Sequence, residues 1–202
     1  MNEALAVELF MEDAAHENLL VPLVKRIALE EGVDVRSQVR TARGGHPRVF
    51  SELEFYLRYR RHLGLDAPLD MIIVAIDSNC NSFAQTRSSI EDAVGQEYRH
   101  LLVAACPDPH IERWYMADVN SFYEVVGYQP DLGSEKCERN YYKAILRKAV
   151  QMGGHPQTLG GIEFAAELAE KMDLYRAGRM ERSLKVFVED LRSKFRIRVP
   201  AP

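Results

Sequence analysis

The stretch MIIVAI at residues 71–76, followed by Asp77 in DSNCN (77–81), decides how this chain is expected to fold. A continuous apolar run of this length, rich in β-branched residues and preceded by Pro68, is typical of a parallel strand buried on both faces. The residue that follows such a strand lies in the crevice where open α/β sheets bind their ligands. The sequence therefore predicts that the Asp77 carboxylate lies at a site of chemistry.

Two further acids are expected at strand ends. Glu8 follows a short apolar run near the start of the chain, and Glu112 comes shortly after the apolar run 101–106. Carboxylate oxygens are the hard ligands that Mg²⁺ and Mn²⁺ take, and Asn79 offers an amide oxygen in the same loop as Asp77. The pattern predicts a divalent metal site with Glu8, Asp77 and Asn79 as ligands. Glu8 is also a candidate general base.

Each acid taken alone has a simpler interpretation. A carboxylate just before a helix is commonly an N-cap, which accepts hydrogen bonds from the first turn, or a solvated charge. Asp13 and Asp118 fit this interpretation best, because each precedes an expected helix start.

The wider pattern alternates strands with helices over the first half of the chain. Strands are expected around Leu5, Val35, Ile73 and Leu102. Apolar residues at helical spacing fill the segments between them, and only helical patterns remain from Ile111 onward. We therefore predict an α/β core over residues 1–110, with a central, mostly parallel sheet flanked by helices. A helical region over 111–202 is expected to pack on this core as part of a single compact unit.

Length and composition are consistent with that fold. The chain has 202 residues, of which 47% are hydrophobic, enough to bury a sizeable core. No apolar run approaches the roughly 20 residues that cross a bilayer, and the first residues lack the basic region of a signal peptide, so a cytoplasmic protein with no membrane association is expected. Three cysteines without a CxxC pair, and six histidines without HExxH spacing, predict reduced thiols and no zinc site.

The charge distribution suggests one basic surface. A net charge of -4 argues against a general nucleic-acid coat, but residues 33–63 hold seven arginines against three acids. We expect Arg40, Arg43 and Arg48 to contact nucleic acid, and the interleaved aromatics Phe50, Tyr56 and Tyr59 are candidates for stacking on bases. The alternative is an amphipathic helix whose aromatics face the core and whose arginines are solvated.

Three short segments carry a family resemblance. VELFMED (7–13), VAIDSN (74–79) and IERWYMAD (111–118) resemble the signatures of small prokaryotic TOPRIM-like proteins, related to the nuclease domains of the OLD family and to RloB-like proteins. GGIEFAA (160–166) and RSLKVF (182–187) resemble the C-terminal helices of that group. The order of these segments agrees with the expected sheet.

The resemblance implies a TOPRIM-like fold and a Mg²⁺- or Mn²⁺-dependent nuclease that cleaves DNA or RNA phosphodiesters. It also implies a role in prokaryotic anti-phage defence with an ABC-type or SMC-like ATPase partner, and the protein is expected to form a homodimer. By position, Glu8 would be the acid of the first motif, Asp77 the metal ligand and Glu112 an auxiliary catalytic acid. Leu9 stands where the family has Gly, and Asn79 stands where it has a second Asp.

Two other functions remain open. One is a degenerate TOPRIM-like module that binds a partner or nucleic acid without cleaving it, its site having decayed at Leu9 and Asn79. The other is a nucleotide-binding protein of flavodoxin-like strand order. The absence of a GK[ST] phosphate loop and of a GxGxxG motif disfavours the second of these.

Overall fold

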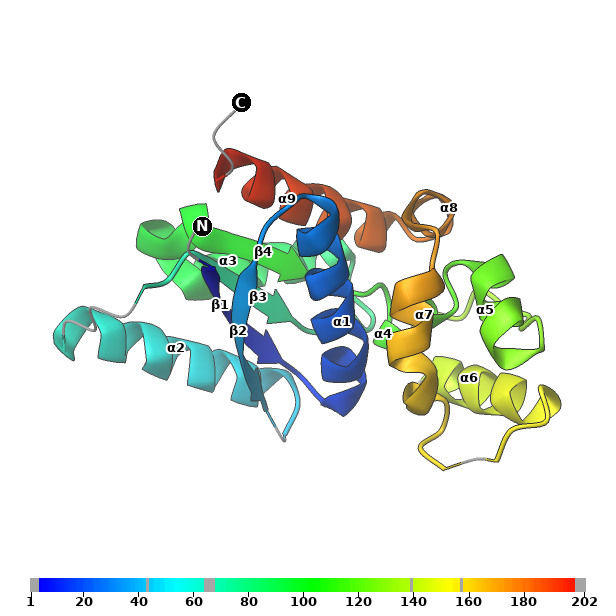
Figure 1. Ribbon diagram of the computed structural model, residues 1–202. Helices are drawn as coiled ribbons and strands as arrows, with labels where there is room; N and C mark the ends of the chain where they lie inside the picture. The colour runs from blue at the N-terminus through cyan, green and yellow to red at the C-terminus, as the bar shows by residue number, and fades with distance from the viewer. Residues whose placement is uncertain (1–3, 43, 64–67, 139, 157, 199–202) are drawn as a thin grey trace.

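The protein is an α/β structure built on one four-stranded parallel sheet (Figure 1). The computed structural model describes residues 4–42, 44–63, 68–138, 140–156 and 158–198. The strands are β1 (Leu5–Met11), β2 (Val35–Thr41), β3 (Met71–Ala75) and β4 (Leu102–Ala105), in the spatial order β2-β1-β3-β4. The prediction of four parallel strands in these segments is confirmed, as is the central position of the strand before Asp77.

The burial of each strand follows its apolar pattern. All five residues of β3 are buried, as expected for a strand with neighbours on both sides and helices on both faces. In β1 the side chains alternate: Val7, Leu9 and Met11 belong to one hydrophobic cluster, while Phe10 belongs to the other. The strand β2 forms one edge of the sheet, and its residues are half-buried or exposed.

Helices cover both faces of the sheet. The first face carries α1 (Ala14–Glu30) and α9 (Arg182–Arg198), and the second carries α2 (His46–Leu63) and α3 (Phe83–Tyr98) (Figure 1). Asp13 caps α1 as expected, because its side chain accepts hydrogen bonds from the backbone N–H groups of Ala15 and His16. Pro22 lies inside α1, and Gly32 (φ 69°) follows its C-terminal end.

The rest of the chain is helical, as predicted. The helices are α4 (Ile111–Tyr115), α5 (Val119–Val126), α6 (Tyr141–Met152), α7 (Ala165–Lys171) and α8 (Leu174–Met180), with short 3-10 turns at η1 (Arg99–Leu101) and η2 (Ile162–Phe164). The helix α8 was not anticipated. Trp114 and Phe187 from this region join the hydrophobic cluster that α1 builds on the sheet, so the two parts of the chain share one core.

The structure tests what was expected of the three cysteines and of membrane-spanning helices. Cys80 and Cys137 form a disulfide, with Cα atoms 4.9 Å apart, so the prediction of three reduced thiols is wrong for this pair. The cysteines come from two loops that meet only in the folded chain, which their spacing of 57 residues does not reveal. Cys106 is a buried free thiol. In the described part of the chain, no helix has the length and apolar character needed to cross a membrane.

Candidate metal centre

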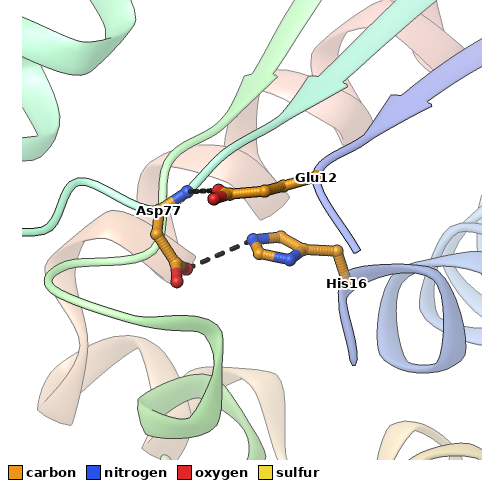
Figure 2. A group of neighbouring side chains, drawn as sticks. All are labelled: Glu12, His16 and Asp77. Carbon is orange, nitrogen blue, oxygen red and sulfur yellow. Dashed lines mark hydrogen bonds and ion pairs between the residues drawn. The ribbon is translucent and has the colours of Figure 1, made fainter. Parts of the chain in front are cut away.

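Two carboxylates meet where the strand order of the sheet reverses. From β1 the chain first adds β2 on one side and then β3 on the other, and ligands of open α/β sheets bind at such a switch point, beyond the carboxyl ends of the strands. Glu12 directly follows β1, and Asp77 lies two residues beyond β3. The backbone N–H of Asp77 donates a hydrogen bond to Glu12 Oε2 (2.9 Å), which holds the two residues together (Figure 2).

A buried histidine completes a group of three. His16 lies in the first turn of α1 and has no exposed side-chain surface. Its Nε2 atom is 3.2 Å from Asp77 Oδ1, and one ligand atom each from Glu12, His16 and Asp77 all lie within 4.8 Å of one another (Figure 2). Nε2 is paired with Asp77 Oδ1 and has no hydrogen-bond partner of good geometry among the described residues. A buried imidazole nitrogen that lies beside two carboxylates in this way fits a metal ligand, which it becomes when the ion displaces its proton.

The other nitrogen of His16 fixes the ring. Nδ1 is 2.8 Å from Asp13 Oδ1, the same oxygen that caps α1. Burial alone would lower the pKa of His16, but the charges of Asp77 and Asp13 outweigh it and raise the pKa well above its usual value. A carboxylate that orients an imidazole in this way is the usual support of a histidine ligand.

The carboxylate of Asp77 is held by two further contacts besides the one with His16. Its Oδ1 atom accepts a hydrogen bond from the backbone N–H of Ile111 (2.7 Å), and His110 Nδ1 lies 3.1 Å from Oδ2. Burial would raise the pKa of Asp77, but His16 and His110 outweigh it and lower the pKa. Asp77 is therefore a buried carboxylate that stays ionised and is fixed in orientation.

A third histidine reaches the site from α2. His46, at the start of α2, places Nε2 at 3.0 Å from Glu12, and this hydrogen bond raises the pKa of the imidazole. Asn79 Nδ2 is 3.3 Å from the same ring nitrogen, and the Asn79 backbone N–H donates to the carbonyl of Pro109. Asn79 thus lies beside the site with its amide nitrogen directed at His46. The group of three ligands does not include it.

Glu112 lies next to the cluster and lines a small pocket. Its side chain is 3% exposed, and Oε2 has no hydrogen-bond partner among the described residues. Burial and the charge of Asp77 raise its pKa, and Lys143 opposes them with Nζ at 3.8 Å from Oε1. Lys143 also lies 4.0 Å from Asp13. The pocket has a volume of about 220 Å³ and is lined by Asp13, Glu112, Lys143 and Arg147 among others.

The expectation that Glu8 ends the first strand is wrong. The strand β1 continues to Met11, and Glu8 lies inside it, paired in register with Ile72 of β3. Asp77 comes five residues after Ile72, which at about 3.3 Å per residue separates the two carboxylates by roughly 16 Å along the sheet. Glu8 therefore cannot share an ion with Asp77. It lies 3.0 Å from Arg40 Nε instead.

The described arginines that were expected to contact nucleic acid lie outside this group of three. Arg40 is the sixth residue of β2, and Arg48 lies in the first turn of α2, where both line a groove between these elements. Arg43 lies outside the residues that the structure describes.

The residues that sequence reasoning missed are Glu12 and the histidines. One histidine follows each of three strands: His16 comes after β1, His46 after β2 and His110 after β4. The spacing tests used for metal sites look for histidines on one helix, and these come from three separate segments of the chain, each after a different strand. The signal that was available is the apolar run LAVELFM (5–11), which continues past its single charge and ends at Glu12.

Comparisons with protein-family models, with curated proteins and with solved structures find no match to this chain.

Proposed function

We propose that this protein is a divalent-metal-dependent phosphodiesterase of the TOPRIM-type nuclease class that acts on DNA or RNA. The observation that carries the proposal is the convergence of Glu12, His16 and Asp77 at the switch point of a parallel sheet, with ligand atoms within 4.8 Å. The segments that resemble TOPRIM-like proteins include two of these residues, Glu12 and Asp77, and their order agrees with the sheet. The TOPRIM-like assignment of the fold is part of this proposal.

Glu12, Asp77 and His16 are the residues that would hold the ion. Two carboxylates suit Mg²⁺ or Mn²⁺, and the imidazole shifts the preference of the site toward Mn²⁺. Bound there, the ion would supply Lewis-acid stabilisation of a phosphoryl oxygen and a water of lowered pKa. Glu12 keeps one oxygen, Oε1, without a hydrogen bond among the described residues, while Oε2 is used by Asp77.

The surrounding side chains suit a phosphodiester. His110 and Lys143 are partly exposed and contact Asp77 and Glu112 respectively. Lys143 is a cation, and the hydrogen bond with Asp77 raises the pKa of His110, so both side chains suit contacts with phosphate oxygens. Glu112 is the remaining carboxyl with an unused buried oxygen, so it is placed to accept or donate the proton that hydrolysis requires. In this proposal Glu112 carries out the proton transfer that was predicted for Glu8 from the sequence.

A second candidate function, binding of nucleic acid without cleavage, is favoured by the contacts of Asp77. Both oxygens of Asp77 already contact protein donors, with Ile111 N–H on Oδ1 and His110 on Oδ2. An aspartate satisfied in this way also fits a module that binds nucleic acid without cleaving it, its fold held by the same network. The ATPase partner and the role in anti-phage defence remain predictions from the resemblance, and the homodimer remains a prediction that does not rest on it.

Metal binding tests the site without reference to activity. Titration of Mn²⁺ into the pure protein, followed by calorimetry and by electron paramagnetic resonance, should show binding that Glu12→Gln and Asp77→Asn each weaken by at least about tenfold, since each removes a charged ligand. The matched control is Glu8→Gln, which changes an acid on the same strand that the register places away from the site. Circular dichroism of each variant checks that the fold is intact.

Cleavage then separates the two candidates. Supercoiled plasmid and single-stranded RNA are incubated with the protein in Mn²⁺ or Mg²⁺, and we expect cleavage that EDTA stops and that Asp77→Asn abolishes. Cleavage that persists in EDTA or in Asp77→Asn would rule out the assigned mechanism. Metal binding without cleavage of either substrate would favour the module that only binds.

A further inference from the structure

A second hollow lies at the β2 edge of the sheet, between β2 and α2. This β2–α2 groove has a volume of about 780 Å³ and is lined by Arg40, Arg48, Glu52, Phe55, Tyr56 and Tyr59, among others. It begins beside the metal centre, because α2 starts at His46, which contacts Glu12, and Arg48 lies half a turn further on. The helix α2 then runs along the sheet away from the centre (Figure 1).

The apolar surface of the groove is aromatic. Phe55 and Tyr59 are 67% and 43% exposed, and their rings stack with centroids 6.4 Å apart and planes inclined by 21°. Tyr56 lies beneath them in the core, with the Arg40 guanidinium 5.0 Å from its ring centroid. Of the aromatics expected either to stack on bases or to face the core, Tyr56 is buried in the core and Phe50 packs against it, while Tyr59 is exposed. Phe55 was not anticipated as a stacking candidate. Exposed, parallel rings are a surface onto which a flat group can stack.

The rim of the groove is basic. Arg40 and Arg48 are 38% and 62% exposed, and each is paired with one acid, Glu8 and Glu52. On the same two elements Arg36 and Arg58 are exposed and make no ion pair with any described residue. Neither of these two arginines lines the groove itself, and Glu54 is an exposed acid on α2. Arginines on β2 and α2 still outnumber the acids there, Glu52 and Glu54, which favours an anionic ligand.

We propose that the β2–α2 groove binds single-stranded nucleic acid, with bases stacked on Phe55 and Tyr59 and phosphates held by Arg40 and Arg48. The choice of nucleic acid rests on the proposed function, whose metal centre lies at one end of the groove. Stacking on exposed rings requires unpaired bases, because the bases of a duplex are covered by their neighbours. None of the described residues that line the groove is aliphatic, so it lacks the pockets that an amphipathic peptide helix would fill.

Binding is measured with the full chain in EDTA, so that no substrate is consumed. Fluorescence anisotropy follows labelled dT12, rU12 and a 12-base-pair duplex as protein is added. We expect the single strands to bind more tightly than the duplex, and Phe55→Ala and Tyr59→Ala each to weaken binding about tenfold. Tyr123→Ala, which removes a ring that is 57% exposed on α5, is the matched control and should bind as the wild type does.

Charge variants test the phosphate contacts separately. Arg48→Gln should reduce the slope of log affinity against log salt by roughly 0.7, the share of one phosphate on a single strand. Glu52→Gln removes the acid that competes for Arg48 and should tighten binding. Equal affinity of wild type and the Phe55→Ala/Tyr59→Ala double variant, preference for the duplex, or no binding of either single strand would overturn the proposal. So would a dimer in solution that the double variant disrupts, because the groove would then be an interface between copies.

Failure of this proposal can be told apart from failure of the proposed function. Hydrolysis of the small diester bis(p-nitrophenyl) phosphate in Mn²⁺ needs the metal centre alone, so its presence in the wild type and its absence in Asp77→Asn test the proposed function by themselves. Loss of oligonucleotide binding in the double variant, with no hydrolysis by the wild type, would count against the function and support the groove. Hydrolysis by the wild type, together with oligonucleotide binding that the double variant leaves unchanged, would support the function and overturn the groove.

Discussion

At the scale of single residues, Asn79 holds a backbone conformation that few side chains tolerate. Its φ of 52° is in the left-handed region, where asparagine and glycine are the residues usually found. This turn carries the chain from Asp77 toward the start of α3, and the Asn79 N–H donates to the carbonyl of Pro109. The backbone conformation therefore explains why an asparagine occupies position 79, whether or not its side chain binds a ligand.

Two substitutions at Asn79 separate these roles. Asn79→Ala should lower the free energy of unfolding by about 1 kcal/mol, because a Cβ without a polar group disfavours positive φ, while Asn79→Gly should leave it nearly unchanged. Urea denaturation measures both. Asn79→Gly also removes the amide oxygen, and we expect its Mn²⁺ affinity to match that of the wild type. Weaker binding in Asn79→Gly with unchanged stability would show that the amide is a ligand, as the sequence suggested.

The acids show how far a site can be predicted from one sequence. Asp77 was placed correctly just beyond the end of a central strand, because a fully apolar run marks clearly where that strand ends. Glu8 was wrongly predicted to end the first strand. It lies inside β1, half-buried against Arg40, and a charged residue after a short apolar run resembles the end of a strand. His16 and His110 could not be found at all, since the contacts that define them join segments 61 and 33 residues away from Asp77.

At the scale of elements, Asp118 ties the start of α5 to α8. Its carboxylate, 3% exposed, accepts hydrogen bonds from the guanidinium of Arg176 at 3.0 and 2.9 Å and from the backbone N–H of Asp173. The sequence predicted an N-cap, but the Asp118 side chain accepts no hydrogen bond from the backbone N–H groups of the first turn of α5. Its partner Arg176 lies 58 residues away in α8, a helix that was not anticipated. The helix has seven residues with Gly178 inside it, too short and too interrupted for its periodicity to stand out.

The pH dependence of the free energy of unfolding tests the interaction between Asp118 and Arg176. Burial alone would raise the pKa of Asp118, but hydrogen bonds led by Arg176 and Ser121 outweigh it and lower the pKa to about 2. The unfolded value is near 3.9, so the stabilising contribution is complete above about pH 5 and is lost as the pH falls from about 4 toward 2. Allowing for the partial exposure of Arg176, its size is about 1–2 kcal/mol.

Asp118→Asn should therefore be less stable than the wild type at pH 7, with the difference shrinking below pH 4. Urea denaturation at a series of pH values measures it, with Asp92→Asn, which changes an acid that is 78% exposed, as the control. A difference that stays constant from pH 7 to pH 2 would show that the carboxylate charge is not what holds α8.

At the scale of the whole molecule, the two halves of the chain share one hydrophobic core. Leu19 and Leu23 of α1 and Leu184 and Phe187 of α9 are all fully buried in the same cluster as Val103 of the sheet. Ion pairs extend the contact at its rim, where Arg196 forms two hydrogen bonds with Glu31 at the end of α1. The helical region was predicted from its pattern, but its position could not be, because an amphipathic stripe does not identify the surface it will cover.

The shared core predicts that the protein unfolds as a unit. The single tryptophan, Trp114, is fully buried in the helical region, where its Nε1–H donates to Ser183 Oγ (2.9 Å), so its fluorescence reports on that half of the molecule. Far-ultraviolet circular dichroism reports on all helices and strands. In urea the two signals should give the same midpoint and the same slope, as expected for a two-state transition.

A truncated chain provides the complementary measurement. Residues 1–110 alone would expose the face of the sheet and of α1 that α9 and α7 now cover, including Leu19 and Leu23, so this fragment should lack a cooperative transition and should bind a dye for exposed apolar surface. The fragment should also bind Mn²⁺ poorly, because it lacks Ile111, whose N–H donates to Asp77, and it ends at His110, whose contact with Asp77 is then no longer held by the chain that follows. A fragment that unfolds cooperatively and binds Mn²⁺ as tightly as the full chain would show instead that the α/β core is a separate domain, and that the helical region contributes nothing to the site.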